Sequence, residues 1–432
     1  MPTLLIKNGR LLDPANERDE LADVYLEDGK VKEVGPKLSA AADETIDATG
    51  MLVTPGLIDL HVHLREPGQE HKETIFTGTR AAAAGGFTTI VAMPNTTPVI
   101  DTQADVNLIH SVAQRDALIN VRTTAAITVE SAGEQITEFG DLVSAGAVGF
   151  TDDGRTLMNS EIMRRALEYT SMFNVPVMDH CEDVNLVGTG VMNEGPTSAV
   201  LGLPGIPAAA ESVIVARDIE LAEHTGGHCH IQHVSAAHSI ELIRDGKARG
   251  VKVTAEATPH HLCLTEEALT EFDTNCKMAP PLRTEQDRAT LRAALRDGTI
   301  DCIATDHAPH REMEKELPFV DAPNGVIGLE TAFPACYTML VEEGELTLKR
   351  LVELLTCNPA RVLDFNKGTL TPGADADVTV IDLEGQRKVS REIFLSKSTN
   401  SAFLGQVLKG WPSCTVVGGK IVFAEGRIVE KA

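Results

Sequence analysis

Eight short apolar segments alternate with helical patterns in the middle of this chain, and this alternation restricts the fold more than any other feature of the sequence. Helical patterns such as 73–86, 160–173 and 208–227 lie between the apolar segments. Eight strands with intervening helices over about 300 residues are typical of an α/β (β/α)8 TIM-type barrel. A doubly wound sheet is the alternative, but no G-x-G-x-x-G follows any of the segments. The predicted strands lie within residues 52–63, 87–93, 120–128, 147–153, 175–180, 228–235, 251–261 and 300–309.

The two ends of the chain differ from the middle and contain mainly short strand patterns, such as "ADVYLEDGKVKEVG" and "CTVVGGKIVFAEGRIV". The dipeptides Asn8-Gly9 and Asp28-Gly29 predict hairpin turns, because type I′ turns need positive φ at both central positions. We therefore expect one small composite β-sandwich domain built from residues 1–53 and 365–432. The barrel is expected to span residues 54–364.

Composition and charge argue against several classes of partner. The 432 residues carry 38 basic and 63 acidic side chains, a net charge of −25, so nucleic acid and anionic membranes are not expected to bind. No run of 18 apolar residues and no signal peptide stands out. Eight cysteines without a C-x-x-C pair predict buried thiols in a reducing compartment. We expect a soluble, cytoplasmic protein.

Histidine and aspartate side chains stand at the ends of five predicted strands. Alternation along a strand points side chains two residues apart to the same face. The carboxyl ends of barrel strands form the active-site face, so these groups should converge there, where leaving them uncompensated would be costly. Imidazole and carboxylate groups suit zinc and related ions, and six of them suit two ions that activate a water. The residues concerned are His61, His63, Asp152 or Asp153, His180, His233 and Asp306.

Several motifs resemble the dihydroorotase branch of the amidohydrolase superfamily, above all its bacterial type I enzymes. They are "PGLIDLHVHLREPG", "VAMPNTTP", "DHCED", "IQHVS", "KMAPPLR", "ATDHAPH" and "GLET", and the resemblance extends over nearly the whole chain. It implies a zinc-dependent, reversible cyclisation of N-carbamoyl-L-aspartate to L-dihydroorotate in pyrimidine biosynthesis.

The resemblance implies two zinc ions and a ligand set. The first ion would be held by His61, His63 and Asp306, and the second by His180 and His233. Asp306 would also serve as the catalytic general base and then acid.

The bridging ligand departs from the pattern of many relatives, which use a carbamylated lysine on the fourth strand. The segment "GAVGFTDDG" has no lysine, so an aspartate is expected instead. Alternation lets only one of Asp152 and Asp153 face the metals. The sequence alone leaves this choice open, and the family pattern favours Asp153.

The resemblance also implies a substrate-binding set. Arg65 offers a bidentate fork that matches a substrate carboxylate. Ala279 stands where an asparagine is common in relatives, which predicts weaker binding or a different substrate. The histidines at 228, 230 and 307 are interpreted as structural or solvated, and those at 260 and 261 are not assigned to the metals. The full set is His63, Arg65, Asn95, Ala279, His310, Asn324 and Gly325.

Two alternative functions remain open. Another cyclic amidohydrolase, of allantoinase or hydantoinase type, is disfavoured by Arg65 and by the fourth-strand aspartate. A non-catalytic dihydroorotase-like scaffold for aspartate transcarbamoylase is disfavoured because every expected metal ligand is retained. We expect a homo-oligomer, with or without association with aspartate transcarbamoylase. The native metal, its occupancy and the preferred direction of reaction stay open.

Overall fold

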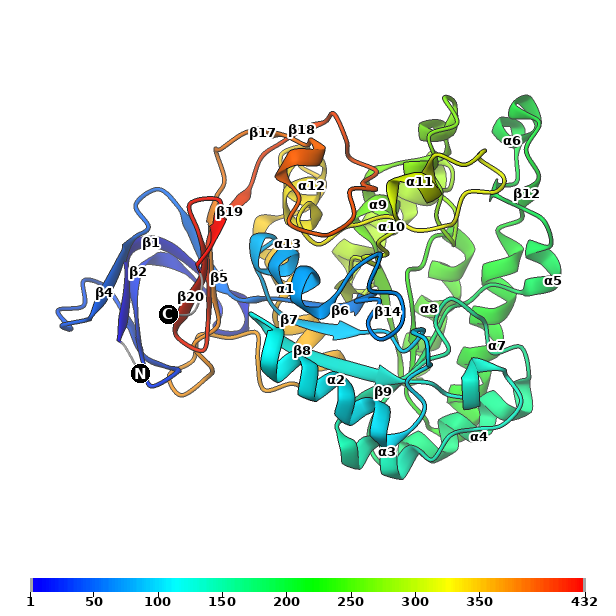
Figure 1. Cartoon of the computed structure of the whole chain (residues 1–432), viewed down its shortest axis with the longest axis horizontal. Helices are drawn as coiled ribbons and strands as arrows, with labels where there is room; N and C mark the ends of the chain where they lie inside the picture. The colour runs from blue at the N-terminus through cyan, green and yellow to red at the C-terminus, as the bar shows by residue number, and fades with distance from the viewer. Residues whose placement is uncertain (1–2, 430–432) are drawn as a thin grey trace.

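Eight parallel strands form the centre of the larger part of the molecule (Figure 1). This computed structural model describes residues 3–429. Neighbours in the sheet follow chain order, and a parallel bridge between Val62 and His307 joins the first strand to the segment after the last. The predicted (β/α)8 barrel is therefore confirmed. Its strands are β6 (Leu57–Val62), β7 (Phe87–Ala92), β8 (Asn120–Ala125), β9 (Ala147–Phe150), β10 (Val177–Asp179), β13 (Cys229–Ile231), β14 (Val253–Ala257) and β15 (Cys302–Ile303).

Helices between the strands cover the outside of the barrel (Figure 1). Several begin at a threonine whose hydroxyl accepts a backbone N–H of the first turn, as Thr74, Thr102 and Thr284 do. Three end at a left-handed glycine: Gly146, Gly226 and Gly298. The covering helices are α1 (Ile75–Ala84), α2 (Gln103–Asp116), α3 (Phe139–Ala145), α4 (Ser160–Ser171), α7 (Ala209–Thr225), α8 (Ala237–Ala248), α10 (Glu285–Asp297) and α13 (Leu348–Leu355).

Shorter elements lie in the connections and several of them surround the carboxyl ends of the barrel strands. After β10 come α5 (Val184–Val187), β11 (Met192–Asn193), α6 (Pro196–Leu201) and β12 (Gly205–Ile206). The later ones are α9 (Pro259–Cys263), α11 (Glu312–Lys315), α12 (Ala332–Cys336) and α14 (Cys357–Val362). Single turns occur at η1 (Pro14–Asn16), η2 (Val129–Ser131), η3 (Glu266–Leu269), η4 (Thr274–Cys276), η5 (Tyr337–Val341) and η6 (Arg391–Ile393).

Strands from both ends of the chain form a second sheet with its own apolar core (Figure 1). The two ends meet where β5 pairs antiparallel with β16, with Val53 opposite Val380. The expected composite β-domain is therefore confirmed, while its limits at residues 53 and 365 stay a prediction. Its strands are β1 (Leu4–Asp13), β2 (Arg18–Glu27), β3 (Lys30–Gly35), β4 (Glu44–Asp47), β5 (Leu52–Pro55), β16 (Val378–Asp382), β19 (Trp411–Val417), β20 (Lys420–Ala424) and β21 (Arg427–Ile428).

The two predicted hairpin turns have different outcomes. Asp28-Gly29 joins β2 to β3, and both residues have positive φ, as a two-residue hairpin requires. The prediction for Asn8-Gly9 was wrong, because this dipeptide lies inside β1 at a β-bulge between the pairs of Ile6 and Gly9. Asn8 still adopts a φ of 61°, so the dipeptide indicated the local backbone conformation but not a chain reversal.

The segment between β16 and β19 leaves the β-sheet and lies against the barrel. It contains the short pair β17 (Arg387–Lys388) and β18 (Val407–Leu408). Phe394 and Phe403 join the barrel's apolar core, and Asn400 Nδ2 donates to the carbonyl oxygens of Ala308 and Gly325. The C-terminal region thus supports the rim of the barrel as well as the β-domain.

The cysteines are all unpaired and buried, which agrees with their interpretation as small core residues. Within residues 3–429, no helix has the length and apolar character that crossing a membrane requires.

Candidate metal centre

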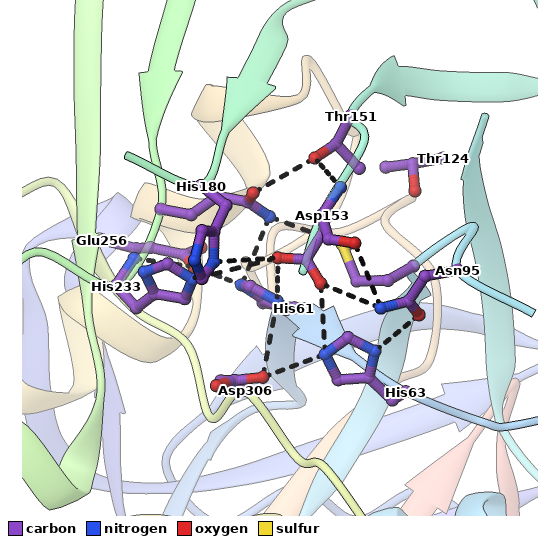
Figure 2. A network of polar contacts seen from close by, with 12 residues as sticks. His61, His63, Asn95, Thr124, Thr151, Asp153, His180, His233, Glu256 and Asp306 are labelled. Carbon is purple, nitrogen blue, oxygen red and sulfur yellow. Dashed lines mark hydrogen bonds and ion pairs between the residues drawn. The ribbon is translucent and has the colours of Figure 1, made fainter. Parts of the chain in front are cut away.

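Two histidines of the first barrel strand face two aspartates from distant strands (Figure 2). His61 lies in β6 and His63 directly follows it. His61 Nε2 is 3.2 Å from Asp153 Oδ1 and 3.5 Å from Asp306 Oδ1. His63 Nε2 is 3.0 Å from Asp306 Oδ1 and 3.4 Å from Asp153 Oδ2. The alternation along β6 thus brings both imidazoles to the same two carboxylates.

The remaining predicted histidines approach Asp153 from another direction. His180 follows β10, and its Nδ1 lies 3.0 Å from Nε2 of His233. These two nitrogens are 3.9 Å and 3.8 Å from Asp153 Oδ1. Asp153 therefore lies between two pairs of imidazoles, as Figure 2 shows.

The structure separates the two adjacent aspartates that the sequence left open. Asp152 turns toward Thr128, whose backbone N–H donates to Asp152 Oδ1 at 3.0 Å. Asp153 faces the histidines. Consecutive side chains at a strand end point to opposite sides, which is why only one of the two reaches this cluster.

The cluster fits a divalent metal. Donor atoms of His61, His63 and Asp306, and of His61, Asp153 and His233, form two groups that each lie within 4.8 Å. Ligands about 2.0–2.1 Å from a tetrahedral zinc lie about 3.3 Å apart, which matches the spacing around His61 and His63. His61 Nε2 is buried and has no hydrogen-bond partner among the described residues. Nitrogen and carboxylate donors in this arrangement suit zinc and similar ions.

The electrostatics of the cluster also favour a bound cation. Burial alone would raise the pKa of the Asp153 and Asp306 carboxyl groups. The neighbouring imidazoles of His61 and His63 outweigh burial and hold both pKa values below the usual range. Burial lowers the pKa of His61, but the surrounding carboxylates raise it well above its usual value. The carboxylates are therefore ionised and concentrate negative charge around the imidazole nitrogens.

Each of three histidines is oriented by an acceptor behind it. His61 Nδ1 lies 2.7 Å from Glu256 Oε1, and His180 Nε2 lies 3.0 Å from Glu182 Oε2. His63 Nδ1 lies 2.9 Å from Asn95 Oδ1. In the neutral imidazole, these bonds place the proton on the outer nitrogen and leave the inner one as a ligand.

Sequence reasoning missed the two glutamates. Glu256 is the one charged residue within β14, and Glu182 follows His180 by two positions in "DHCED". These two sequence positions could have indicated a role for the glutamates, although neither position reveals which imidazole the carboxylate contacts.

A cavity of about 740 Å³ opens above the cluster. Asp153, His180, His233 and Asp306 contribute to its lining. Every residue of the predicted substrate-binding set also lines it: His63, Arg65, Asn95, Ala279, His310, Asn324 and Gly325.

Comparisons with known proteins show the family to which this chain belongs. Residues 50–239 match the family described as dihydro-orotase-like, and residues 210–423 match the amidohydrolase family. A protein of Pelotomaculum thermopropionicum named dihydroorotase is 53% identical over 98% of this chain and 99% of its own length. One of Geobacter metallireducens with the same name is 52% identical over 97% and 99%. The chain belongs to the dihydroorotase family.

Solved structures with the same fold include proteins that are named for a different activity. The L-hydantoinase (dihydropyrimidinase) from Arthrobacter aurescens has a TM-score of 0.90 and 28% identity, covering 100% of this chain and 98% of its own. A D-hydantoinase from Thermus sp. has a TM-score of 0.84 at 28% identity, covering 99% and 97%. The dihydroorotase family and these hydantoinases therefore share the barrel with its β-domain.

Arg65 and His310 both present hydrogen-bond donors to the cavity. Arg65 is buried, and its Nε donates to Pro309 O at 3.3 Å. Among residues 3–429, neither of its Nη atoms has a protein acceptor. Burial, together with the charges of Arg65 and Lys72, lowers the pKa of His310 to about 2, so its imidazole is neutral. Lys72 Nζ is 3.3 Å from His310 Nδ1, and an ammonium can only donate, so the imidazole proton resides on Nε2.

Gly325 forms a wall of the cavity that tolerates no side chain. Its φ is 116°, and a Cβ atom would lie 2.7 Å from Ala308 Cβ and 3.3 Å from His310 Nε2. A glycine is therefore needed for both the backbone conformation and the close approach.

Three of the four other buried histidines have hydrogen-bond partners outside the cluster. His230 Nε2 is 3.1 Å from Glu256 Oε2, and His307 Nδ1 accepts the backbone N–H of Gly328. His261 contacts Pro280 O at 2.9 Å. His260 is buried with no partner for Nε2 in the described chain. None of these four belongs to the two ligand groups that include Asp153 and Asp306, although His230 forms a separate group of possible ligands with Glu256 and Cys302.

Proposed function

We propose that this chain is a zinc-dependent dihydroorotase that interconverts N-carbamoyl-L-aspartate and L-dihydroorotate in pyrimidine biosynthesis. The observation that carries the proposal is a single cavity that contains both the ionised metal-type cluster and the buried Arg65 guanidinium. Dihydroorotate has a cyclic amide carbonyl and a free carboxylate, so it needs both features at once. The relatives at 53% and 52% identity are named dihydroorotase, which supports the same activity.

Two zinc ions are proposed for the cluster. When bound, they would polarise the amide carbonyl and lower the pKa of a water molecule. His61 and Asp306 would hold the first ion with His63, and Asp153 would bridge to a second ion held by His180 and His233. The three acceptors behind the imidazoles, Glu256, Glu182 and Asn95, would keep the ligand nitrogens free of protons.

Asp306 would carry the proton. In the hydrolytic direction, the water oxygen bonds to the ring carbonyl carbon and the ring C–N bond breaks. Asp306 accepts the water proton and donates it to the leaving ring nitrogen, and the reverse direction returns it. Its carboxylate lines the cavity and is ionised beside His61 and His63, which is the form required of a base.

The substrate carboxylate would bind to Arg65 and His310. The guanidinium would donate two parallel hydrogen bonds, and the neutral His310 would donate a third from Nε2. Asn95 would join by turning one of its two Nδ2 hydrogens away from Asp153, to which Nδ2 now donates. Asn324 and Gly325 would contact the ring from the other elements of the rim, and Ala279 would leave space where relatives have an amide.

The alternatives are less well supported. A hydantoin or allantoin carries no carboxylate that would use the buried Arg65 charge, and the fourth-strand lysine expected for a hydantoinase is absent. A non-catalytic scaffold would not need a complete and oriented cluster of ligands.

The deciding experiment compares substrates on purified protein. We expect hydrolysis of L-dihydroorotate, followed by ultraviolet absorbance, to exceed that of hydantoin and allantoin, and metal analysis to find up to two divalent ions per chain. Chelation should remove activity and zinc should restore it. Faster turnover of hydantoin or allantoin, or full activity of the metal-free protein, would contradict the proposal.

Assembly and location follow as further proposals. We propose a cytoplasmic homo-oligomer, with aspartate transcarbamoylase as the candidate protein partner. Light scattering of the protein alone measures the oligomeric state. Light scattering of a mixture with the transcarbamoylase tests the association.

A further inference from the structure

Two buried lysines lie beneath the loop that follows α11 and covers one side of the cavity. Lys277, in the "KMAPPLR" motif, is 4% exposed. Its Nζ donates to three backbone carbonyl oxygens of the loop, at 2.7 Å, 2.9 Å and 2.7 Å. These oxygens belong to Phe319, Val320 and Ala322.

Lys315, the last residue of α11, binds the next part of the same loop and is 6% exposed. Its Nζ donates to Pro323 O at 2.9 Å and to Gly325 O at 3.0 Å. It also reaches Lys277 O at 3.5 Å, and the Gly325 N–H donates to that same oxygen at 3.0 Å. The two side chains and the loop backbone therefore form one connected network.

Neither ammonium has a counter-charge at contact distance. Among residues 3–429, no carboxylate lies within 4 Å of Lys277 Nζ or Lys315 Nζ. Burial, with repulsion from Lys277, lowers the pKa of Lys315 to about 7. A buried charge is costly unless hydrogen bonds compensate it, and here the carbonyl oxygens of the loop provide that compensation. These hydrogen bonds thus fix the loop backbone in an arrangement in which its carbonyl oxygens surround the two Nζ atoms.

The loop has few other fixed contacts: Asn400 Nδ2 donates to Gly325 O, and the backbone N–H groups of Asp321 and Ala322 donate to Pro318 O. Residues 316–325 contain no helix or strand, and Leu317 and Val320 are 46% and 51% exposed. Phe319 packs in a small apolar cluster with Met278. Apolar burial therefore anchors the loop at Phe319 and Ala322, while the ammonium groups bind five of its carbonyls.

The geometry points to Lys277 and Lys315 as positioning residues that hold Asn324 and Gly325 at the cavity wall by binding the backbone carbonyls of residues 319–325. Neither ammonium lines the cavity, so both act through the loop. The effect on the loop is independent of the reaction, whereas the effect on substrate binding rests on the proposed function.

Hydrogen–deuterium exchange of the full chain in slightly acidic buffer, where Lys315 is protonated, tests the anchoring. Lys277→Met and Lys315→Met remove the charge and keep most of the side-chain volume. Lys349→Met, at an exposed lysine of α13, is the matched control. We expect amides of 316–325 to exchange about tenfold faster or more in each buried variant, since hydrogen bonds to a charged group are lost. Exchange in β9 should match the wild type.

Kinetics tests the positioning. In Lys277→Met and Lys315→Met we expect KM for dihydroorotate to rise about tenfold, with kcat within about twofold and the metal content unchanged. If Lys277→Met does not give folded protein, Lys315→Met carries both measurements, because it leaves the Lys277 bonds intact.

The outcomes are distinguishable. Unchanged loop exchange, or exchange that rises equally in β9, overturns the anchoring. Faster loop exchange with unchanged KM, or a fall in kcat with loss of metal, overturns the positioning role. A wild-type protein that is inactive on dihydroorotate refutes the proposed function, and a rise in exchange confined to the loop then still supports the anchoring.

Discussion

His61 Nδ1 and Glu256 Oε1 lie 2.7 Å apart in the interior of the barrel, although 195 residues separate them in sequence. Glu256 also accepts from His230 Nε2 at 3.1 Å. Burial raises the pKa of Glu256, but the His61 and His230 imidazoles outweigh it and lower this pKa to about 2. The ionised carboxylate therefore holds a proton of His61 on Nδ1 and leaves Nε2 facing Asp153 and Asp306.

We expect Glu256→Gln to weaken metal binding by about 10–100-fold, because the amide keeps the volume but removes the charge that holds the His61 tautomer. Competition with a chromogenic chelator measures the zinc dissociation constant directly. Glu134→Gln, at an exposed glutamate, is the control and should bind zinc as the wild type does. Equal zinc affinity in Glu256→Gln would show that His61 is oriented without this carboxylate.

The proposed proton carrier gives a second prediction. Asp306→Asn should lower kcat by at least about 100-fold, since general acid–base catalysis contributes about 10²–10⁴-fold. The amide preserves the shape of the site, so dihydroorotate binding, measured by calorimetry, should stay within about tenfold of the wild type. Metal content is measured in parallel, because Asp306 is also a proposed ligand. A near-normal kcat at full metal occupancy would remove the proton-transfer role.

Substitutions of Arg65 test whether its guanidinium binds the substrate carboxylate. Arg65→Lys keeps a positive charge but loses the planar fork, and Arg65→Ala loses both. Since a hydrogen bond to a charged group contributes about 1.5–3 kcal/mol, we expect kcat/KM for dihydroorotate to fall about 10–100-fold in Arg65→Ala, mainly through KM. Arg65→Lys should be intermediate. A change confined to kcat would mean that the guanidinium acts on the reacting atoms and not on the carboxylate.

The buried carboxyl group of Glu330 should make the free energy of unfolding depend on pH. Burial, together with the charge of Glu73, raises the pKa of this carboxyl from 4.5 to about 8. Its carboxyl accepts the backbone N–H groups of Leu395 and Ser396. Between these two pH values the folded chain binds a proton that the unfolded chain has released, so the free energy of unfolding falls as pH rises, by at most about 1.4 kcal/mol per pH unit.

The urea midpoint of unfolding, measured at several pH values across this range, checks the effect. Glu330→Gln keeps the acceptor and removes the titration, so its midpoint should fall less with rising pH than that of the wild type. Glu134→Gln should follow the wild type. Parallel curves for Glu330→Gln and wild type would show that Glu330 is ionised in the folded protein.

The sequence by itself determined the barrel, the β-domain from both ends and the residue types at the strand ends. These depend on local periodicity: apolar strands alternate with helices, and side chains two apart, such as His61 and His63, share a face. The same local rule explains the error at Asn8-Gly9, because a positive φ serves a β-bulge as well as a hairpin. The substrate-binding residues implied by the family resemblance also line the cavity.

Only the tertiary structure decided which partner each of these groups has. It placed Asp153 and not Asp152 among the histidines, put Glu256 and Glu182 behind two imidazoles, and buried Lys277 and Lys315 against the carbonyls of one loop. Periodicity specifies the face on which a side chain lies, but it contains no information about the strand or loop that faces it. Those pairings arise when the closed barrel brings distant segments within hydrogen-bonding distance, where the cost of burying an uncompensated charge selects one arrangement.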